Sequence, residues 1–142
     1  MSAASNYLEN ALLNHTLRNT AYTQPGGLWL ALFKSTVDGA TTLANLEGGT
    51  TSTDEVGTSG TAYARKAIEF GSTSTGTSAN SNIVTFDAAT ASWGTITHIA
   101  VMDGSTRGSG NVLFYGAVTT SKTIDTGDTF QVSIGNLTIA LA

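Results

Sequence analysis

The two histidines are the first residues to test for chemistry, because histidine serves both as a metal ligand and as a general base. His15 lies in an amphipathic segment and His98 lies within the apolar run ITHIAVM. Neither belongs to an H-x-x-x-H or H-E-x-x-H pattern, which would place two zinc ligands together, and no G-x-S-x-G motif supplies a serine nucleophile. We therefore expect His98 to be a half-buried strand residue whose ring is satisfied by a neighbour.

Asp125-Thr126-Gly127 matches the tripeptide of the aspartic proteases, in which two carboxylates share one proton. The chain holds a single copy, so a homodimer would have to supply the second carboxylate. Asp128 follows directly, and Asp, Thr and Gly are ordinary turn residues. The sequence favours a solvated turn at this position.

Four further acids, Asp38, Glu47, Asp54 and Glu55, lie in one polar stretch but lack the spacing of a calcium loop. A calcium ion at a subunit interface stays open as an alternative. A glycoside hydrolase would need two carboxylates about 5–5.5 or 6.5–9.5 Å apart in a cleft. Because the acids fall mostly in turns, we predict no enzyme and no cofactor.

Trp29 and Trp93 are candidates for stacking on sugar rings. Trp29 belongs to an all-apolar run and is expected in the core. Trp93 stands at the entry to a strand, which makes it the better candidate for a surface contact. Even for Trp93, packing in the core or in an interface is the favoured interpretation.

The elements that position these residues begin with a helix predicted over residues 5–19, capped by Ser5 or Asn6. The apolar stripe of this helix is a candidate for docking to a capsid or another partner. We assign that docking role to Tyr7, Leu8, Leu12 and Leu13. If the stripe packs on the rest of the chain instead, docking must use the loops.

A β-sandwich is predicted over residues 28–141, where about seven apolar or alternating segments are separated by Gly-rich turns. Residues 28–33 are apolar on both faces and indicate a central strand. Residues 35–61 form a long polar stretch, which we expect to be an exposed, mobile loop. The last two strands, near 130–134 and 137–141, are predicted to form a hairpin. The fold class is thus mainly β, a single sandwich or jelly-roll-like domain with a short N-terminal helix.

Composition narrows the functional classes. Only 11% of the 142 residues are charged, and the net charge is −4 with six scattered Lys and Arg residues, so nucleic-acid binding is not expected. No apolar run approaches the roughly 20 residues that span a bilayer. Thr and Ser make up 39 residues, and a surface of short hydroxyl side chains is typical of extracellular and virion proteins.

Several stretches resemble small structural proteins of tailed-phage particles, which are described as tail-fibre-like or head-decoration-type proteins. The most specific stretch is the opening NYLENALLNHTLRNT, and the resemblance continues through residues 30–33, 63–70, 91–98 and 119–123. The resemblance implies a non-enzymatic virion protein, made in the host cytoplasm and carried on the particle surface. It also implies a homo-oligomer, for which we favour a trimer, and contact with the major capsid protein or other virion proteins.

The position in the particle is a separate question. A receptor-binding fibre usually has a shaft of heptads or β-helical repeats, and this chain has neither. We therefore expect a surface decoration or cement subunit that binds and stabilises the capsid shell. The alternative is a tail-fibre or tail-tip domain that contacts host surface glycans.

Overall fold

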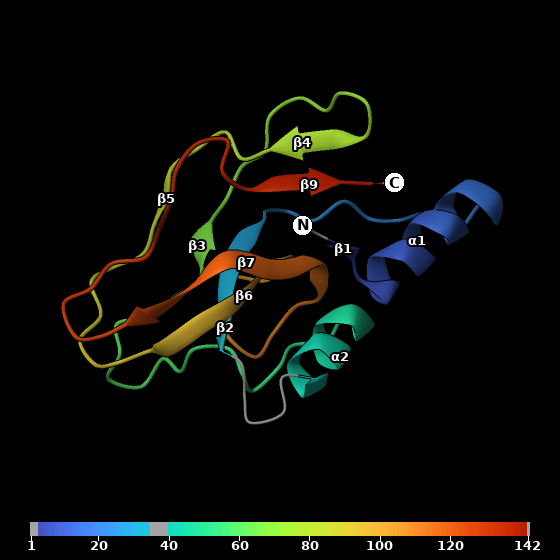
Figure 1. Cartoon of the computed structure of the whole chain (residues 1–142). Coiled ribbons are helices and arrows are strands. Elements are labelled where there is room, and N and C mark those ends of the chain that lie inside the picture. Colours follow the sequence, from blue (N-terminus) through green and yellow to red (C-terminus); the bar gives the residue numbers. More distant parts are fainter. Residues whose placement is uncertain (1–2, 35–39, 142) are drawn as a thin grey trace.

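A computed structural model of the chain describes residues 3–34 and 40–141, and it is mainly β, as predicted (Figure 1). The described elements are β1 (Ala3–Ala4), α1 (Asn6–Leu17), β2 (Trp29–Lys34), α2 (Ala40–Gly48), β3 (Lys66–Ala67), β4 (Thr77–Ala79), β5 (Val84–Thr85), β6 (Gly94–Met102), β7 (Val112–Ile124), β8 (Gln131–Val132) and β9 (Thr138–Ala140).

The largest sheet is antiparallel and has the strand order β1-β7-β6-β2-β3. Its centre is built by β6, which pairs with β2 on one side and with β7 on the other. Residues 30–33 of β2 are fully buried, which confirms the strand predicted from an apolar run without alternation.

Two layers cover this sheet, one on each face. Leu30, Leu32 and Val101 belong to a cluster that packs against the two-stranded β4–β9 and β5–β8 pairs. Ala31, Phe33 and residues next to them in the sheet form a second cluster with Leu46 of α2. In Figure 1 the β4–β9 pair lies above the sheet and α2 lies below it. This arrangement is consistent with the predicted β-sandwich.

The polar stretch 35–61 is not the exposed loop that we expected. Residues 35–39, with Asp38, lie outside the described residues, but residues 40–48 form α2 and place Leu46 in the core. Asp54, Glu55 and Val56 are buried as well. Leu46 packs against the apolar side chains of Phe33 and Met102, and this burial stabilises the position of α2 on the sheet. The polar composition of the stretch did not indicate this contact.

The Glu55 carboxylate can be buried because the Arg65 guanidinium, which is also buried, balances its charge. Its Oε1 accepts from Arg65 Nε and from the Tyr63 hydroxyl, each at 2.8 Å, and its Oε2 accepts from Arg65 Nη2 at 2.8 Å. Arg65 Nη1 also donates to the carbonyls of Gly104 and Ser109. Arg107, in the same turn, donates to the Glu55 carbonyl. This network fixes the turn between β6 and β7.

The predicted pairing of the last two strands is wrong. β8 and β9 do not form a hairpin, because β8 pairs with β5 and β9 pairs with β4. The reason is Asn80, which is 1% exposed: it accepts from Leu137 N and donates to Ser133 O, and so holds the bend between the two strands. β7 continues through residues 121–124, and the turn that follows it begins at Asp125.

Candidate functional site

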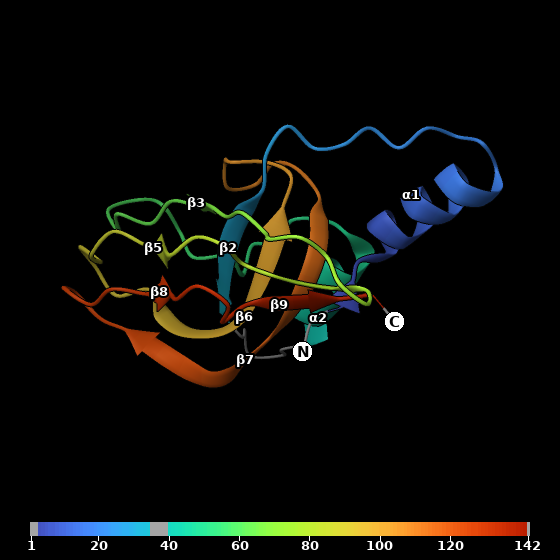
Figure 2. The same ribbon diagram turned by 90° about the horizontal axis from the view of Figure 1, so that it is seen from above.

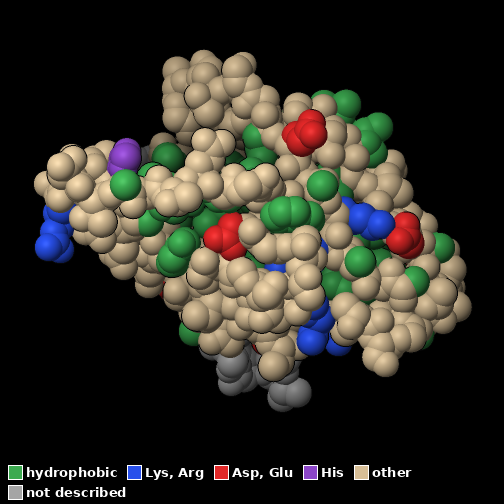
Figure 3. Space-filling model, turned by 180° about the vertical axis from the view of Figure 1, so that it is seen from behind, with side chains coloured by type: hydrophobic (Ala, Val, Ile, Leu, Met, Phe, Trp, Pro, Cys, Tyr) green, Lys and Arg blue, Asp and Glu red, His purple; other side chains and the backbone are tan. Residues whose placement is uncertain are grey.

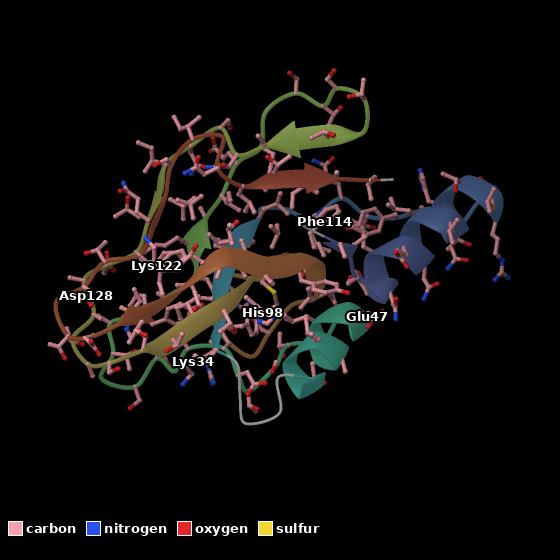
Figure 4. All side chains as sticks on the ribbon, in the orientation of Figure 1. Lys34, Glu47, His98, Phe114, Lys122 and Asp128 are labelled. Carbon is pink, nitrogen blue, oxygen red and sulfur yellow. The ribbon has the colours of Figure 1, made fainter. Side chains whose placement is uncertain are left out.

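An open apolar cleft lies between the two layers of the sandwich, with a volume of about 490 Å³. Its floor comes from β6 and β7, including Ile99, Val101 and Phe114. Its roof comes from the C-terminal segment, including Phe130 and Ile139. Figure 4 shows Phe114 on the β9 side of the sheet and His98 on the opposite side, toward α2. The lining residues are 99–101, 114–119, 130–132 and 136–140.

The cleft is open because strands end along this side of the molecule. β1 pairs with β7 only at Phe114 and Tyr115, so beyond them the outer edge of β7 pairs with no described strand. Opposite, β9 pairs with β4 alone among the described strands. A large bulge bends β7 here: it advances from Ala117 to Lys122 while β6 advances only from His98 to Ile96. Core side chains of the sandwich therefore reach solvent.

The lining of the cleft is uncharged. Tyr115 is the one ionisable residue among those that line it, but its side chain packs on the opposite face of the sheet, with the cluster that contains Leu46. There, burial, followed by the Glu47 and Glu9 carboxylates, raises the pKa of the Tyr115 hydroxyl. Thr, Asn and Gln side chains also line the cleft. A charged group placed inside would lose hydration without gaining a partner, so the cleft suits an apolar, uncharged occupant.

Helix α1 projects from the body of the domain (Figure 2), and it contacts β7, a strand that lines the cleft. It is attached at its first turn, where the buried Ser5 Oγ accepts from Leu8 N at 3.2 Å and also donates to the Val112 carbonyl. Leu8 is 5% exposed and packs on the body. Leu13 and Leu17, in the second half of the helix, are 55% and 76% exposed.

The docking residues predicted on this helix therefore separate into two groups. Leu8 is buried within its own chain, which contradicts a docking role, because its burial anchors the helix to the sandwich. Leu12 is half-buried, whereas Tyr7 and Leu13 are exposed. Leu17, which the prediction left out, is the most exposed leucine of the helix. Its spacing of four residues from Leu13 was the signal in the sequence.

Trp93 is 1% exposed, so its assignment as a possible surface contact is wrong. Its ring lies edge-on to Tyr63, with ring centroids 5.4 Å apart, and to Phe86, at 6.2 Å. The indole Nε1 donates to the Thr61 carbonyl at 2.8 Å, which satisfies the only polar atom of the side chain. Trp93 is a core residue, which agrees with the interpretation that the sequence favoured.

The two histidines do not form a site. His98 is half-buried and shares a hydrogen bond of 2.9 Å with Thr97 Oγ1, as predicted, and burial lowers its pKa. His15 Nδ1 accepts from Tyr22 N at 3.2 Å. Across residues 3–34 and 40–141, no three His, Asp or Glu side chains are grouped as metal ligands would be.

Asp125 and Asp128 form the turn that was predicted in place of a protease site. Asp128 Oδ2 accepts from Asp125 N at 2.9 Å, and Gly127 has a φ of 91°, which a residue with a Cβ adopts rarely. Both carboxylates are exposed. The turn lies at the opposite end of the molecule from α1 (Figure 4).

Charged side chains are few in this protein, at 11% of its residues. On the face seen in Figure 3, Lys and Arg side chains are scattered among a majority of uncharged polar side chains and backbone, and no basic patch is visible. Among the helices that the structure describes, none is long and apolar enough to cross a bilayer.

Comparison with known proteins gives one informative result. The family model described as "Podophage GP4 fiber I protein gp80" matches residues 3–140, which is nearly the whole chain. No curated protein matches the sequence.

Proposed function

The chain belongs to the family of podophage GP4 fiber I protein gp80, and from this membership we propose that it is a fibre subunit of a phage particle. The match carries the proposal because it extends from β1 to β9 and so includes every element of the fold. A phage structural protein was the coarser expectation from the sequence, and the family supports it.

The family supports a fibre more than the capsid decoration that we favoured from the sequence. Decoration was inferred from the small size of the chain and from the absence of a shaft. Neither observation distinguishes a cement subunit from a short globular fibre domain. We therefore propose the fibre position, with the chain on the outside of the virion and in contact with other virion proteins.

We propose that the role is structural or adhesive rather than catalytic. Exposed loops rich in Thr and Ser, such as residues 72–76, offer hydroxyl groups for hydrogen bonds to host surface glycans. Because Trp93 is buried, such contacts would rely on hydrogen bonds and not on stacking against this ring. Fibre proteins assemble by symmetry, so a homo-oligomer, with a trimer as our choice, belongs to the same proposal.

The copy number of this protein in purified virions, measured against the major capsid protein by quantitative mass spectrometry, tests the fibre position. We expect a few copies per particle, in a small multiple set by the symmetry of the tail. A ratio near one-to-one, or a simple icosahedral fraction, would instead favour decoration of the capsid. Absence from the particle would overturn both positions.

Binding of the purified protein to host cells and to a glycan array tests the adhesive role separately. We expect saturable binding to susceptible cells that free host glycan displaces. If binding is absent while the protein is present in virions at fibre copy number, the role is structural.

A further inference from the structure

The cleft and the end of α1 have complementary properties. The cleft has about 490 Å³ of space, an apolar lining and no carboxylate, lysine or arginine. Residues 10–17, the last two thirds of α1, carry no Asp, Glu, Lys or Arg either, and they expose Leu13 and Leu17. Each surface leaves apolar area in water that the other could cover.

We propose that the occupant of the cleft is a second copy of this chain, with Leu13 and Leu17 of one copy seated in the cleft of the next. The two surfaces match in charge, because neither places a charge where the other would bury it. One contact of this kind would cover both the most exposed leucines of the helix and the open side of the sandwich.

The same helix does not fill the cleft of its own chain. Its first turn is held by Ser5, whose N–H donates to the Leu113 carbonyl, and its second half points away from the body (Figures 1 and 2). Because the two surfaces differ, the contact between copies is head-to-tail. Such contacts produce a closed ring when the rotation between subunits closes, and a trimer is the smallest such ring beyond a pair.

The surface area that a stable interface buries requires a wider contact than two side chains. Stable interfaces bury about 1,200–2,000 Å² in total, and two leucines supply only a part of that. The chain after α1 supplies more, because residues 18–21, 23 and 24 are exposed and belong to no helix or strand. We therefore include residues 19–24 in the surface that contacts the neighbouring copy and leave the charged Arg18 in solvent at its edge.

Engineered cysteines test the contact directly, because the chain has no cysteine of its own. Leu17→Cys marks the helix, and Thr119→Cys marks the exposed rim of the cleft on β7. Mixing the two purified variants under mild oxidation should produce a disulfide-linked pair that contains one of each. Thr126→Cys, in the turn far from α1, is the matched control and should not link to Leu17→Cys.

Two outcomes would overturn the proposal. If Leu17→Cys links to itself as efficiently as to Thr119→Cys, the helices pair with one another and the cleft is not the site. If Leu17→Cys links to neither variant and the protein sediments as a monomer at all concentrations, no such contact exists. Both results are independent of where the protein lies in the particle, so they leave the fibre position untouched, although a monomer at all concentrations would also remove the homo-oligomer from the proposed function.

A second pair of variants does not depend on cross-linking. Leu17→Asp places a charge at an exposed position, where it should not affect folding, and should abolish the association seen by sedimentation. Ile134→Asp is the matched control, since Ile134 is 60% exposed and lies outside the cleft lining. Loss of association in the control but not in Leu17→Asp would contradict the proposed surface.

Discussion

At the scale of single residues, the stability of the fold depends on the buried ion pair of Glu55 and Arg65. Both side chains are fully buried, and Arg65 reaches two carbonyls of the turn between β6 and β7 in addition to its carboxylate. A buried charge of this kind is tolerated only while its partner remains. From the sequence we expected Glu55 to be exposed to solvent, because it lies in a polar stretch.

Replacing Glu55 by Gln should destabilise the fold by about 3–5 kcal/mol, because it leaves the Arg65 guanidinium buried without a counter-charge. The free energy of unfolding, measured in a urea titration, checks this value. Glu69→Gln is the control, since Glu69 is exposed, and it should change the unfolding free energy by less than about 0.5 kcal/mol. Equal effects of the two substitutions would show that the pair is not important for stability.

The buried hydroxyl of Tyr63 should make the stability of the fold depend on pH in the alkaline range. Burial first, and then the nearby Glu55 carboxylate, raise the pKa of the Tyr63 hydroxyl far above its ordinary value of 10.0. The stability from this group is therefore fully present below pH 10 and is lost as the pH rises above that value, because the unfolded chain then releases a proton that the folded chain retains.

The Tyr63→Phe variant should show a smaller loss of unfolding free energy above pH 10 than the unchanged protein. At neutral pH it should be less stable by about 1–3 kcal/mol, because Leu32 N loses its acceptor and Glu55 loses a donor. Thermal unfolding followed between pH 7 and pH 11 measures both effects. An unchanged alkaline slope would show that Tyr63 ionises normally.

At the scale of elements, Ser5 connects α1 to the sandwich. Its hydroxyl caps the helix at Leu8 N and also donates to a carbonyl of β7, while its backbone N–H donates to the Leu113 carbonyl. The helix has only one buried residue, Leu8, so few other contacts hold it in place.

Ser5→Ala should therefore destabilise the attachment of α1 by about 1–2 kcal/mol. Hydrogen exchange of the helix amides should become faster than that of β2 and β6, because the helix can detach without unfolding the sheet. Ser72→Ala, at an exposed loop position, should leave the exchange rates unchanged. A uniform acceleration across the whole chain would show that α1 and the sheet unfold together.

At the scale of the whole molecule, the proposed contact between copies predicts how association responds to salt. Because both surfaces are uncharged, raising NaCl from about 0.05 to 0.5 M should hardly change the dissociation constant, since screening acts on charges. Ammonium sulfate should tighten the association, because excluded salts favour the burial of apolar surface. Sedimentation equilibrium measures both responses, and marked weakening by NaCl would point to an interface held by ion pairs.

The elements with the strongest local patterns could be predicted from the sequence. The apolar run of β2 and the turn at Asp125–Asp128 follow from residue types within a few positions of one another, and so does the helix that Ser5 caps. Of the site, the exposure of Leu13 could be predicted, whereas the burial of Leu8 could not. Spacing along a helix gives an apolar stripe but does not indicate which part of it the body covers.

The sequence by itself determined a mainly β fold with a leading helix, a surface rich in hydroxyl groups and a resemblance to phage structural proteins. Only the tertiary structure decided that Leu46 and residues 54–56 enter the core, that β8 and β9 separate, and that an apolar cleft opens beside α1. The physical reason is that these features depend on partners distant in the chain. Arg65 permits the burial of Glu55, Asn80 holds the bend between β8 and β9, and the cleft is open because β7 pairs with β1 only at Phe114 and Tyr115.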